Sequence, residues 1–453
     1  MGGLTVRPTR ERWLTVDYLN EIRTHADNPQ HMEELYQGAL QAGQTADFEK
    51  AVLAGFEETP ENLLYAVWYY RLKKATPSTQ EKPKGISIWL LALPLAVLNG
   101  LVFWALSDQN FIFLTFAPYV FLFGAPIAAL FMIAFLVWTS RRGLKQALAA
   151  GGGLVVACLY VLLIVPTQSS WYQAPTATLM LIHLALISWV AVGITALSFR
   201  STFEERFPFL IKSLEVFITG GLYLIAGVAF GAITVGMFSA LNIQLPEIII
   251  RLIAGGGAGL LPVIGVASVY DPRLKPSEQD FRQGLSKFIA NMMRLLLPLT
   301  LVILVIYVVV IPFNFMEPFN NRDVLIIYNA MLFAIIGLLL GVTPVRVDDI
   351  SPRLQAALKL GIQVTALLAV LVSLYALSAV IYRTVLGGIT INRLTVIGWN
   401  TLNTGILILL LYRLRHNKSG RWDQELQSVF SLGTVGYTVW GVFVVLAIPL
   451  LFR

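Results

Sequence analysis

Long apolar runs with almost no charge recur from Ile86 to the C-terminus. A bilayer core of about 30 Å requires about 20 apolar residues of a helix that crosses it, and these runs reach that length. Of the 453 residues, 57% are hydrophobic and only 13% are charged, against roughly a quarter charged in ordinary soluble domains. A soluble fold could not solvate this surface. We therefore expect an all-α polytopic membrane protein, a bundle of about eleven transmembrane helices.

The expected spans follow the apolar runs, with polar segments between them. In chain order they cover residues 86–107, 111–138, 144–165, 175–198, 213–240, 246–270, 288–312, 323–343, 356–381, 394–412 and 427–451. The uncharged stretch from Val216 to Pro246 is too long for one upright helix. We expect the fifth span to be tilted or to be followed by a turn at the membrane interface.

The distribution of Lys and Arg tests the span count independently, because cytoplasmic loops keep an excess of positive charge. If the N-terminus is cytoplasmic, nearly all basic residues of the membrane part fall in inner loops, such as Arg141 and Arg142. The outer side keeps only Arg251, Arg322, Arg383, Arg393 and Arg453. A missed span would reverse every later loop. The alternation therefore predicts an odd number of spans and a C-terminus outside.

Residues 1–85 form a separate predicted domain, soluble and helical, ahead of the membrane domain at 86–453. Asn28-Pro29 and Thr59-Pro60 each place a capping side chain before a proline, which is a helix-start signal. Apolar residues recur at helical spacing and predict a hairpin of two packed helices; they are Phe48, Val52 and Phe56, then Leu63, Val67 and Tyr70. Two roles stay open: a cap docked on the membrane part, or a module that binds a protein partner.

Signals of catalysis are missing from the sequence. Every Asp and Glu after residue 85 lies in a loop or near a span end, with Glu215 and Glu247 the deepest, so a carboxylate proton relay is not expected. The histidines are scattered, and no HExxH, GxSxG or GxxxxGK[ST] motif occurs. Cys158 is the only cysteine, which excludes an intramolecular disulfide and a thiolate cluster. We expect no catalytic residue, metal or cofactor, and no nucleic-acid partner, since the net charge of +7 is explained by topology.

Two polar features lie within or beside the spans. His183 is the one imidazole inside a span, and it is either a neutral ring bonded to a neighbouring helix or a group with a proton or ligand role. Glu247 and Arg251 are four residues apart on one helix face, so we expect them to pair.

Glycines and amides mark a candidate pocket. The glycine-rich run from Gly255 to Gly259, followed by Pro262, either lets helices pack closely or breaks a helix and exposes its backbone to a cavity. Asn400 and Asn403 in the tenth span must face another helix or water, because unsatisfied amides are costly in hydrocarbon. Interhelical bonding and a polar pocket both remain open. The candidate pocket-lining residues are Gly256, Gly257, His183, Asn400 and Asn403.

Residues 275–415 carry two segments of a recognisable pattern. The first is Leu285–Phe288 running into Arg294–Leu299, and the second is Tyr382-Arg383 followed by Gly388-Ile-Thr-Ile-Asn-Arg393. This region resembles the bacterial membrane-protein family catalogued as domain of unknown function 4153, although Gly387 stands where that family usually has a tyrosine. The resemblance implies a polytopic fold in the cytoplasmic (inner) membrane of a bacterium, and no activity.

Arg383 and Arg393 are a candidate anion- or lipid-binding pair on the outer side, with Thr390 between them. Two guanidinium groups around a tight turn can hold a lipid phosphate or a carboxylate. The alternatives are snorkelling to the interface or pairing with Glu317 or Asp323.

The many spans, the glycine-interrupted helix and the polar tenth span favour a transporter or permease-like protein for a small or amphipathic anionic solute. The alternative is a non-catalytic scaffold or sensor, in which the N-terminal domain docks a partner and the spans anchor it. A membrane enzyme acting on lipid comes third. Membrane lipids are the expected partners in each case.

Overall fold

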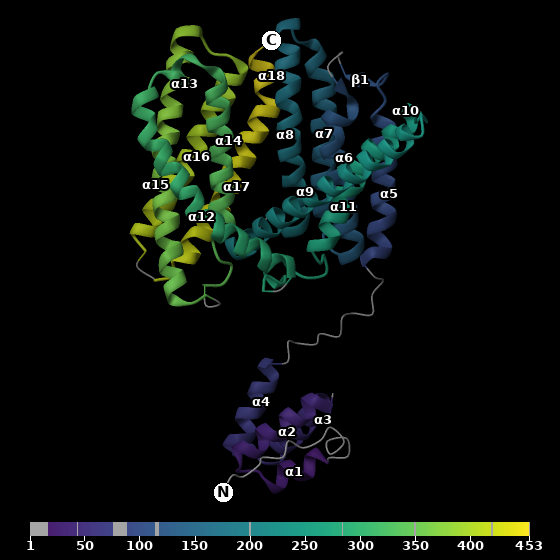
Figure 1. The fold of residues 1–453 in the computed structure, drawn as a ribbon, viewed down its shortest axis with the longest axis vertical. Helices are drawn as coiled ribbons and strands as arrows, with labels where there is room; N and C mark the ends of the chain where they lie inside the picture. The colour runs from purple at the N-terminus through teal and green to yellow at the C-terminus, as the bar shows by residue number, and fades with distance from the viewer. Residues whose placement is uncertain are drawn as a thin grey trace. The chain divides into compact units, whose positions relative to one another are not determined.

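The computed structural model describes residues 17–42, 44–75, 88–113, 117–198, 201–282, 284–347, 350–417 and 420–452. The chain divides into two compact units, Met1–Ile86 and Ser87–Arg453 (Figure 1). Among the described residues, eleven helices of the second unit are long and apolar enough to cross a membrane. The prediction of an all-α polytopic membrane protein is confirmed.

The described part of the first unit contains four helices instead of a simple hairpin. They are α1 (Tyr18–Thr24), α2 (Pro29–Ala42), α3 (Thr45–Glu58) and α4 (Leu63–Ala75). Ile22 of α1, Met32 of α2 and Phe48 of α3 are fully buried and form the centre of its core. Each helix is amphipathic and contributes one face, which is how short helices become stable in a small unit.

One of the two predicted helix starts is correct. The Asn28 side-chain oxygen accepts a hydrogen bond from the His31 N–H at 3.1 Å, so Asn28 caps α2. Thr59, in contrast, ends α3, where its N–H bonds to the Gly55 oxygen. The cap of α4 is Asn62, whose side chain accepts from the Leu64 N–H at 2.9 Å.

The predicted apolar face of α4 is wrong, because Leu63, Val67 and Tyr70 are 78%, 54% and 62% exposed. Tyr65, Trp68 and Leu72 are buried in their place. Trp68 packs its ring 5.6 Å from Phe48 and 5.3 Å from Tyr36, and the Tyr65 hydroxyl donates to the Ile22 oxygen at 3.0 Å. These larger aromatic side chains occupy the interior because they bury more apolar area.

The membrane unit begins with four spans and a short hairpin. Its first spans are α5 (Ile88–Leu106), α6 (Tyr119–Ser140), α7 (Leu144–Ile164, extended by the 3-10 turn η2, Val165–Thr167) and α8 (Ser170–Leu197). The start predicted for the second span is wrong, because β1 (Ile112–Phe113) and β2 (Ala117–Pro118) form an antiparallel pair there. Helix α6 begins only after Pro118, because a proline disfavours helical backbone at the residue before it.

Two of the later spans are irregular. The fifth span is the long helix α9 (Phe203–Ala240), and the sixth consists of α10 (Glu247–Arg251), the π-helical turn η3 (Leu252–Gly256) and α11 (Gly257–Val269). The spans after these are α12 (Gly284–Val310, followed by η5, Ile311–Asn314), α14 (Arg322–Val342), α15 (Pro352–Gly387), α16 (Ile391–Arg415) and α17 (Trp422–Leu446) with α18 (Ile448–Leu451). The short elements η4 (Pro276–Glu278) and α13 (Glu317–Asn320) lie between spans. Helix α9 has 38 residues, about 57 Å at 1.5 Å per residue. It runs obliquely across the bundle (Figure 1), as its length required.

The membrane unit consists of two helix groups, joined by contacts of α17 with α8 and α9. In the first group α5, α6, α7, α8 and α11 pack around buried Phe135, Leu154 and Val263. In the second, α12, α14, α15, α16 and α17 pack around Leu339 and Leu407. Neighbouring helices in sequence are mostly neighbours in space, as short connections demand.

Helices α5 and α11 approach each other at backbone distance. A Cβ added at Gly259 would lie 2.8 Å from the Gly100 Cα, and the Asn99 side-chain amide donates to the Gly259 oxygen at 2.6 Å. Gly256 also faces α5, but Gly257 has no atom within 4 Å of its added Cβ. The close-packing interpretation of the glycine run therefore applies to Gly256 and Gly259, while Gly257 faces open space.

The contact predicts different effects for two glycines of the same helix. Gly259→Leu must push α5 and α11 apart, and we expect it to lower the free energy of unfolding by about 1–3 kcal/mol or more. Gly257→Leu is the matched control and should melt like the parent. Thermal melting of the purified variants in one detergent measures the difference; equal melting temperatures would contradict the packing assignment.

Candidate functional site

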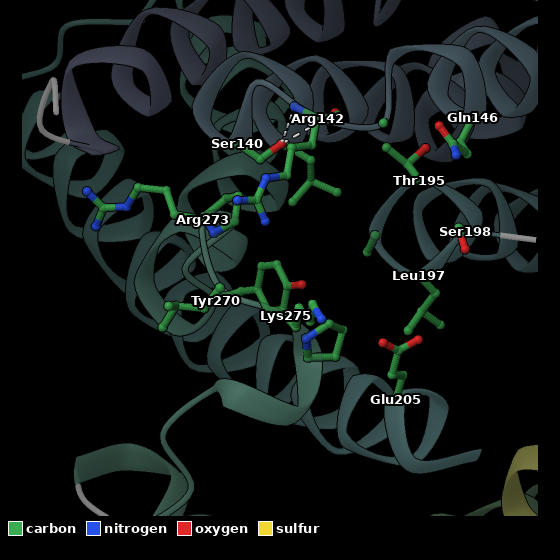
Figure 2. A pocket seen from close by; sticks show the side chains of 16 residues that line it. Ser140, Arg142, Gln146, Thr195, Leu197, Ser198, Glu205, Tyr270, Arg273 and Lys275 are labelled. Atoms are coloured by element: carbon green, nitrogen blue, oxygen red, sulfur yellow. Dashed lines mark hydrogen bonds between the residues drawn. The ribbon is translucent and has the colours of Figure 1, made fainter. Parts of the chain in front are cut away.

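A polar pocket of about 260 Å³ lies at the end of the bundle where α6, α8 and α11 end and α7 and α9 begin. Its walls come from these helix ends and from the loop after α11. In Figure 2 Tyr270 and Glu205 point toward the open centre from different sides, with Gln146 and Thr195 above. We call this the basic pocket, because Arg142, Arg273 and Lys275 line it against one acid, Glu205.

The turn between α6 and α7 positions Arg142. Arg141 and Gly143 both have left-handed backbone, with φ of 54° and 74°, and the Arg142 N–H donates to the Ser140 hydroxyl at 3.2 Å. Gly143 suits this conformation at no steric cost. The left-handed residues on its two sides, Arg141 and Gly143, thus fix Arg142 at the rim of the pocket.

The loop after α11 is held by a buried amide. Gln279 is 6% exposed and accepts from the Asp271 N–H at 3.1 Å while donating to the Asp271 oxygen at 2.8 Å. The Asp271 carboxylate in turn accepts a fork of bonds from the Arg273 guanidinium, at 2.9 and 2.7 Å. A fully bonded loop of this kind gives the pocket a stiff wall.

The pocket keeps positive charge for a ligand. The Asp271 carboxylate holds Arg273, and these hydrogen bonds raise the pKa of Arg273. Burial, with Asp271 adding to it, raises the pKa of Tyr270, so its hydroxyl stays neutral and can donate. Arg142 and Lys275 form no ion pair within the described part of the chain. Two cations and a hydroxyl are therefore available at one opening.

An apolar groove of about 260 Å³ adjoins the basic pocket and shares Leu197 and Ser198 with it. The groove runs between α8, α9 and α17, with Trp189 and Phe209 among its walls. Arg206 stands at its rim, where its Nε donates to the Ser201 hydroxyl at 2.9 Å. A positively charged opening beside an apolar groove is complementary to an anion that also has an apolar part.

His183 is a satisfied ring in the interior. It is 2% exposed, its Nδ1 lies 2.8 Å from the Leu179 oxygen, and its Nε2 lies 3.0 Å from the Trp399 indole nitrogen. The carbonyl only accepts and the indole only donates, so Nδ1 carries the hydrogen and Nε2 accepts. This is the neutral ring bonded to a neighbouring helix that the sequence allowed.

Asn400 and Asn403 are both 1% exposed and face other helices. The Asn403 oxygen accepts from the Tyr437 hydroxyl at 2.7 Å, but both side-chain Nδ2 atoms have no hydrogen-bond partner in the described structure. Asn400 lines a hollow of about 10 Å³ between α14, α15 and α16, space for about one water. The amides therefore belong to the packed interior of the second helix group.

The candidate pocket residues do not share one cavity. His183 reaches α16 through Trp399, one residue before Asn400, whereas Gly256 packs against Gly100 of α5. The tenth span thus meets α8, and the glycine run lies in the first helix group.

The expected pair of Glu247 with Arg251 is wrong. Arg251 crosses to α5, where its Nη1 lies 2.7 Å from the Asp108 carboxylate and its Nη2 donates to the Trp104 oxygen at 3.0 Å. The N–H of Asn110, and next Arg251, lower the pKa of Asp108. The acidic partner of Arg251 therefore lies in the turn after α5, not one turn back in its own helix.

Arg383 and Arg393 line one shallow depression of about 350 Å³, together with Phe319 and Tyr382. The Arg393 Nη1 donates to the Gly388 oxygen at 2.7 Å. Thr390 caps α16 by accepting from the Arg393 N–H at 3.3 Å. Among the described residues neither arginine pairs with Glu317 or Asp323.

Sequence reasoning counted the basic residues of the pocket only as topology signals. It also missed a buried cluster at the start of α9, where the Lys212 ammonium lies 2.8 Å from Glu215 and 2.9 Å from the Ser286 hydroxyl. Lys212 and Glu215 are 4% and 2% exposed. Their i,i+3 spacing was the available signal. The cluster ties the loop before α12 to α9, next to the basic pocket.

Comparisons of the chain with protein-family models, with curated proteins and with solved structures find no match.

The His183–Trp399 bond is testable by a double-mutant cycle. Trp399→Phe removes the indole N–H and leaves a buried ring nitrogen unpaired, so we expect a loss of about 1–3 kcal/mol of stability. His183→Leu together with Trp399→Phe should cost less than the sum of the two single changes. Trp171→Phe, at a site 86% exposed, is the control. Strict additivity in the melting data would rule out the bond.

Proposed function

We propose that this integral membrane protein is a permease-like transporter for an amphipathic anionic solute, with the basic pocket as one of its binding ends. The observation that carries the proposal is the shared wall: the basic pocket and the apolar groove both contain Leu197 and Ser198. A ligand with a charged head and an apolar tail can occupy both at once. A purely polar solute would leave the groove unused.

Different side chains recognise the charged head and the apolar tail of the ligand. Arg142 and Lys275 supply charge-assisted hydrogen bonds to a phosphate or carboxylate, and the Tyr270 hydroxyl adds a neutral donor. The tail lies against Trp189 and Phe209, where burial of apolar surface contributes about 25 cal/mol per Å². Glu205 disfavours a second negative charge on its side of the pocket.

The depression of Arg383 and Arg393 is proposed as the counterpart at the other end of the bundle. It lies where α15 ends and α16 begins, and its aromatic neighbours Phe319 and Tyr382 suit the membrane interface. Arg393 has one nitrogen bonded to the backbone, which orients the rest of its guanidinium. An anion site at each end would give the solute one place to enter and another to leave.

The orientation is part of the proposal. The positive-inside pattern supports a cytoplasmic N-terminus and basic pocket, an outer Arg383–Arg393 depression and an outer C-terminus. The likeness of residues 275–415 to the bacterial family named above supports the inner membrane of a bacterium.

A scaffold or sensor is the second candidate. It is favoured by the separate compact unit Met1–Ile86, which could dock a protein partner while the spans anchor it. The two candidates differ in one respect, since a scaffold moves no solute across the membrane.

The basic pocket gives a direct test in reconstituted vesicles. In phosphatidylcholine vesicles with a trace of fluorescent phosphatidylglycerol, the parent protein should speed movement of the anionic lipid between leaflets. Arg142→Gln with Lys275→Gln should lower bound phosphatidylglycerol in native mass spectrometry by about tenfold for each lost charge-assisted bond. Arg141→Gln, in the same turn but outside the pocket, should change little. Binding without movement would favour the scaffold.

The outer arginines give a second test. Arg383→Lys and Arg393→Lys keep the charge but lose the bidentate geometry, so we expect insertion to be preserved while bound anionic lipid falls. Glu317→Gln and Asp323→Asn should have little effect. If both lysine variants bind lipid like the parent, the pair has only a structural role.

A further inference from the structure

Two histidines and one carboxylate come together in the first unit. Glu21 and His25 are one turn apart on α1, and His31 lies in the first turn of α2. The His25 and His31 rings are 3.9 Å apart between centroids. Both approach the same Glu21 carboxylate oxygen, at 3.5 Å from His25 Nδ1 and 3.2 Å from His31 Nε2. The break between α1 and α2 folds the second histidine back onto the first.

The two nitrogen–oxygen distances match the edges of a coordination tetrahedron. Ligand atoms bound at about 2.0–2.1 Å to a tetrahedral ion are about 3.3–3.4 Å apart. The nitrogens of His25 and His31 and the Glu21 oxygen all lie within 4.8 Å of one another. Two imidazoles and a carboxylate are a usual donor set for Zn²⁺ and similar divalent ions. Binding replaces the present contact of His25 Nδ1 with the Glu21 backbone oxygen, at 3.2 Å.

The surroundings hold the ligands in place. The Asn62 side chain, which caps α4, donates to the Ala26 oxygen at 3.2 Å and so fixes the corner between α1 and α2. His31 Nδ1, the nitrogen that faces away from Glu21, lies 4.0 Å from a Glu34 oxygen. Gln30 donates to the other Glu34 oxygen at 3.2 Å. A carboxylate that accepts a hydrogen bond from the second ring nitrogen commonly orients a metal-bound histidine, and Glu34 would have to close this 4.0 Å separation to do so.

We propose that Glu21, His25 and His31 form a site for a divalent transition-metal ion, with Zn²⁺ the best fit and one coordination position left open. Their side chains are 45%, 37% and 27% exposed, so the ion enters directly from solvent. It links α1 to α2 and stabilises the folded first unit by an amount that grows with the logarithm of the free ion concentration above its Kd.

Co²⁺ titration of the untagged full-length protein in detergent tests the site. The parent should take up one equivalent with the visible absorption bands of four-coordinate cobalt, and Zn²⁺ should displace it. The same Zn²⁺ should slow hydrogen exchange in residues 18–42. His25→Ala with His31→Ala should abolish the bands, and Glu34→Gln should weaken binding by about 10- to 100-fold.

His416→Ala is the matched control, since His416 is an exposed histidine of the membrane unit and should leave cobalt binding unchanged. Because His25 and His31 are partly exposed, their replacement should not unfold the unit, and unchanged circular dichroism checks this. The proposal is overturned if several equivalents of Co²⁺ give no bands in the parent, or if the double variant binds as tightly as the parent.

Discussion

Hydrocarbon offers no hydrogen bonds, so every backbone N–H and C=O inside the membrane must be satisfied within the protein. That constraint explains why the membrane unit is helical from α5 onward and why its short hairpin, β1–β2, lies between spans. It also accounts for Asn99, whose amide reaches the Gly259 oxygen at the closest helix contact. Where two backbones meet this tightly, side-chain donors from the facing helix help to complete the bonding.

The same constraint gives Arg251 and Arg393 a structural role. Arg251 donates to the Trp104 oxygen in the last turn of α5, and Arg393 donates to the Gly388 oxygen just beyond α15. Carbonyls at a helix C-terminus lack partners inside the helix, and a cation beside them is favourable. Each guanidinium thus satisfies a helix end.

The spans could be predicted because they depend on length and apolarity, which are local properties of the sequence. Contacts between helices could not. Arg251 pairs with Asp108, which is 143 residues away, instead of with the expected Glu247. The local sequence of α10 contains no indication of that partner. The exposed Leu63 and buried Trp68 show the same limit, since the period of α4 was evident but its phase was set by aromatic packing with Phe48.

The candidate sites also differ in whether they depend on local sequence or on contacts between helices. His183 and Asn403 were identified because a polar residue in a span is conspicuous. The basic pocket combines residues from several helix ends and from the loops beside them, so Arg142 and Lys275 were visible only as charges. The histidines at positions 25 and 31 looked scattered for a related reason. Their proximity depends on the corner after α1, whose geometry is fixed by Asn62 in another helix.

Helix α9 has a consequence for the surrounding bilayer. Its buried side chains end at Thr219, and every residue from 222 to 230 is exposed, so within the described structure its second half leans chiefly on the sixth span, for example through the Tyr223 and Ser268 hydroxyls at 3.1 Å. A tilted helix meets a thinner bilayer by leaning further and a thicker one by standing up, at a modest cost per ångström. Helix α9 also carries Glu205 near its N-terminus, so any change in the tilt of this helix would move one wall of the basic pocket.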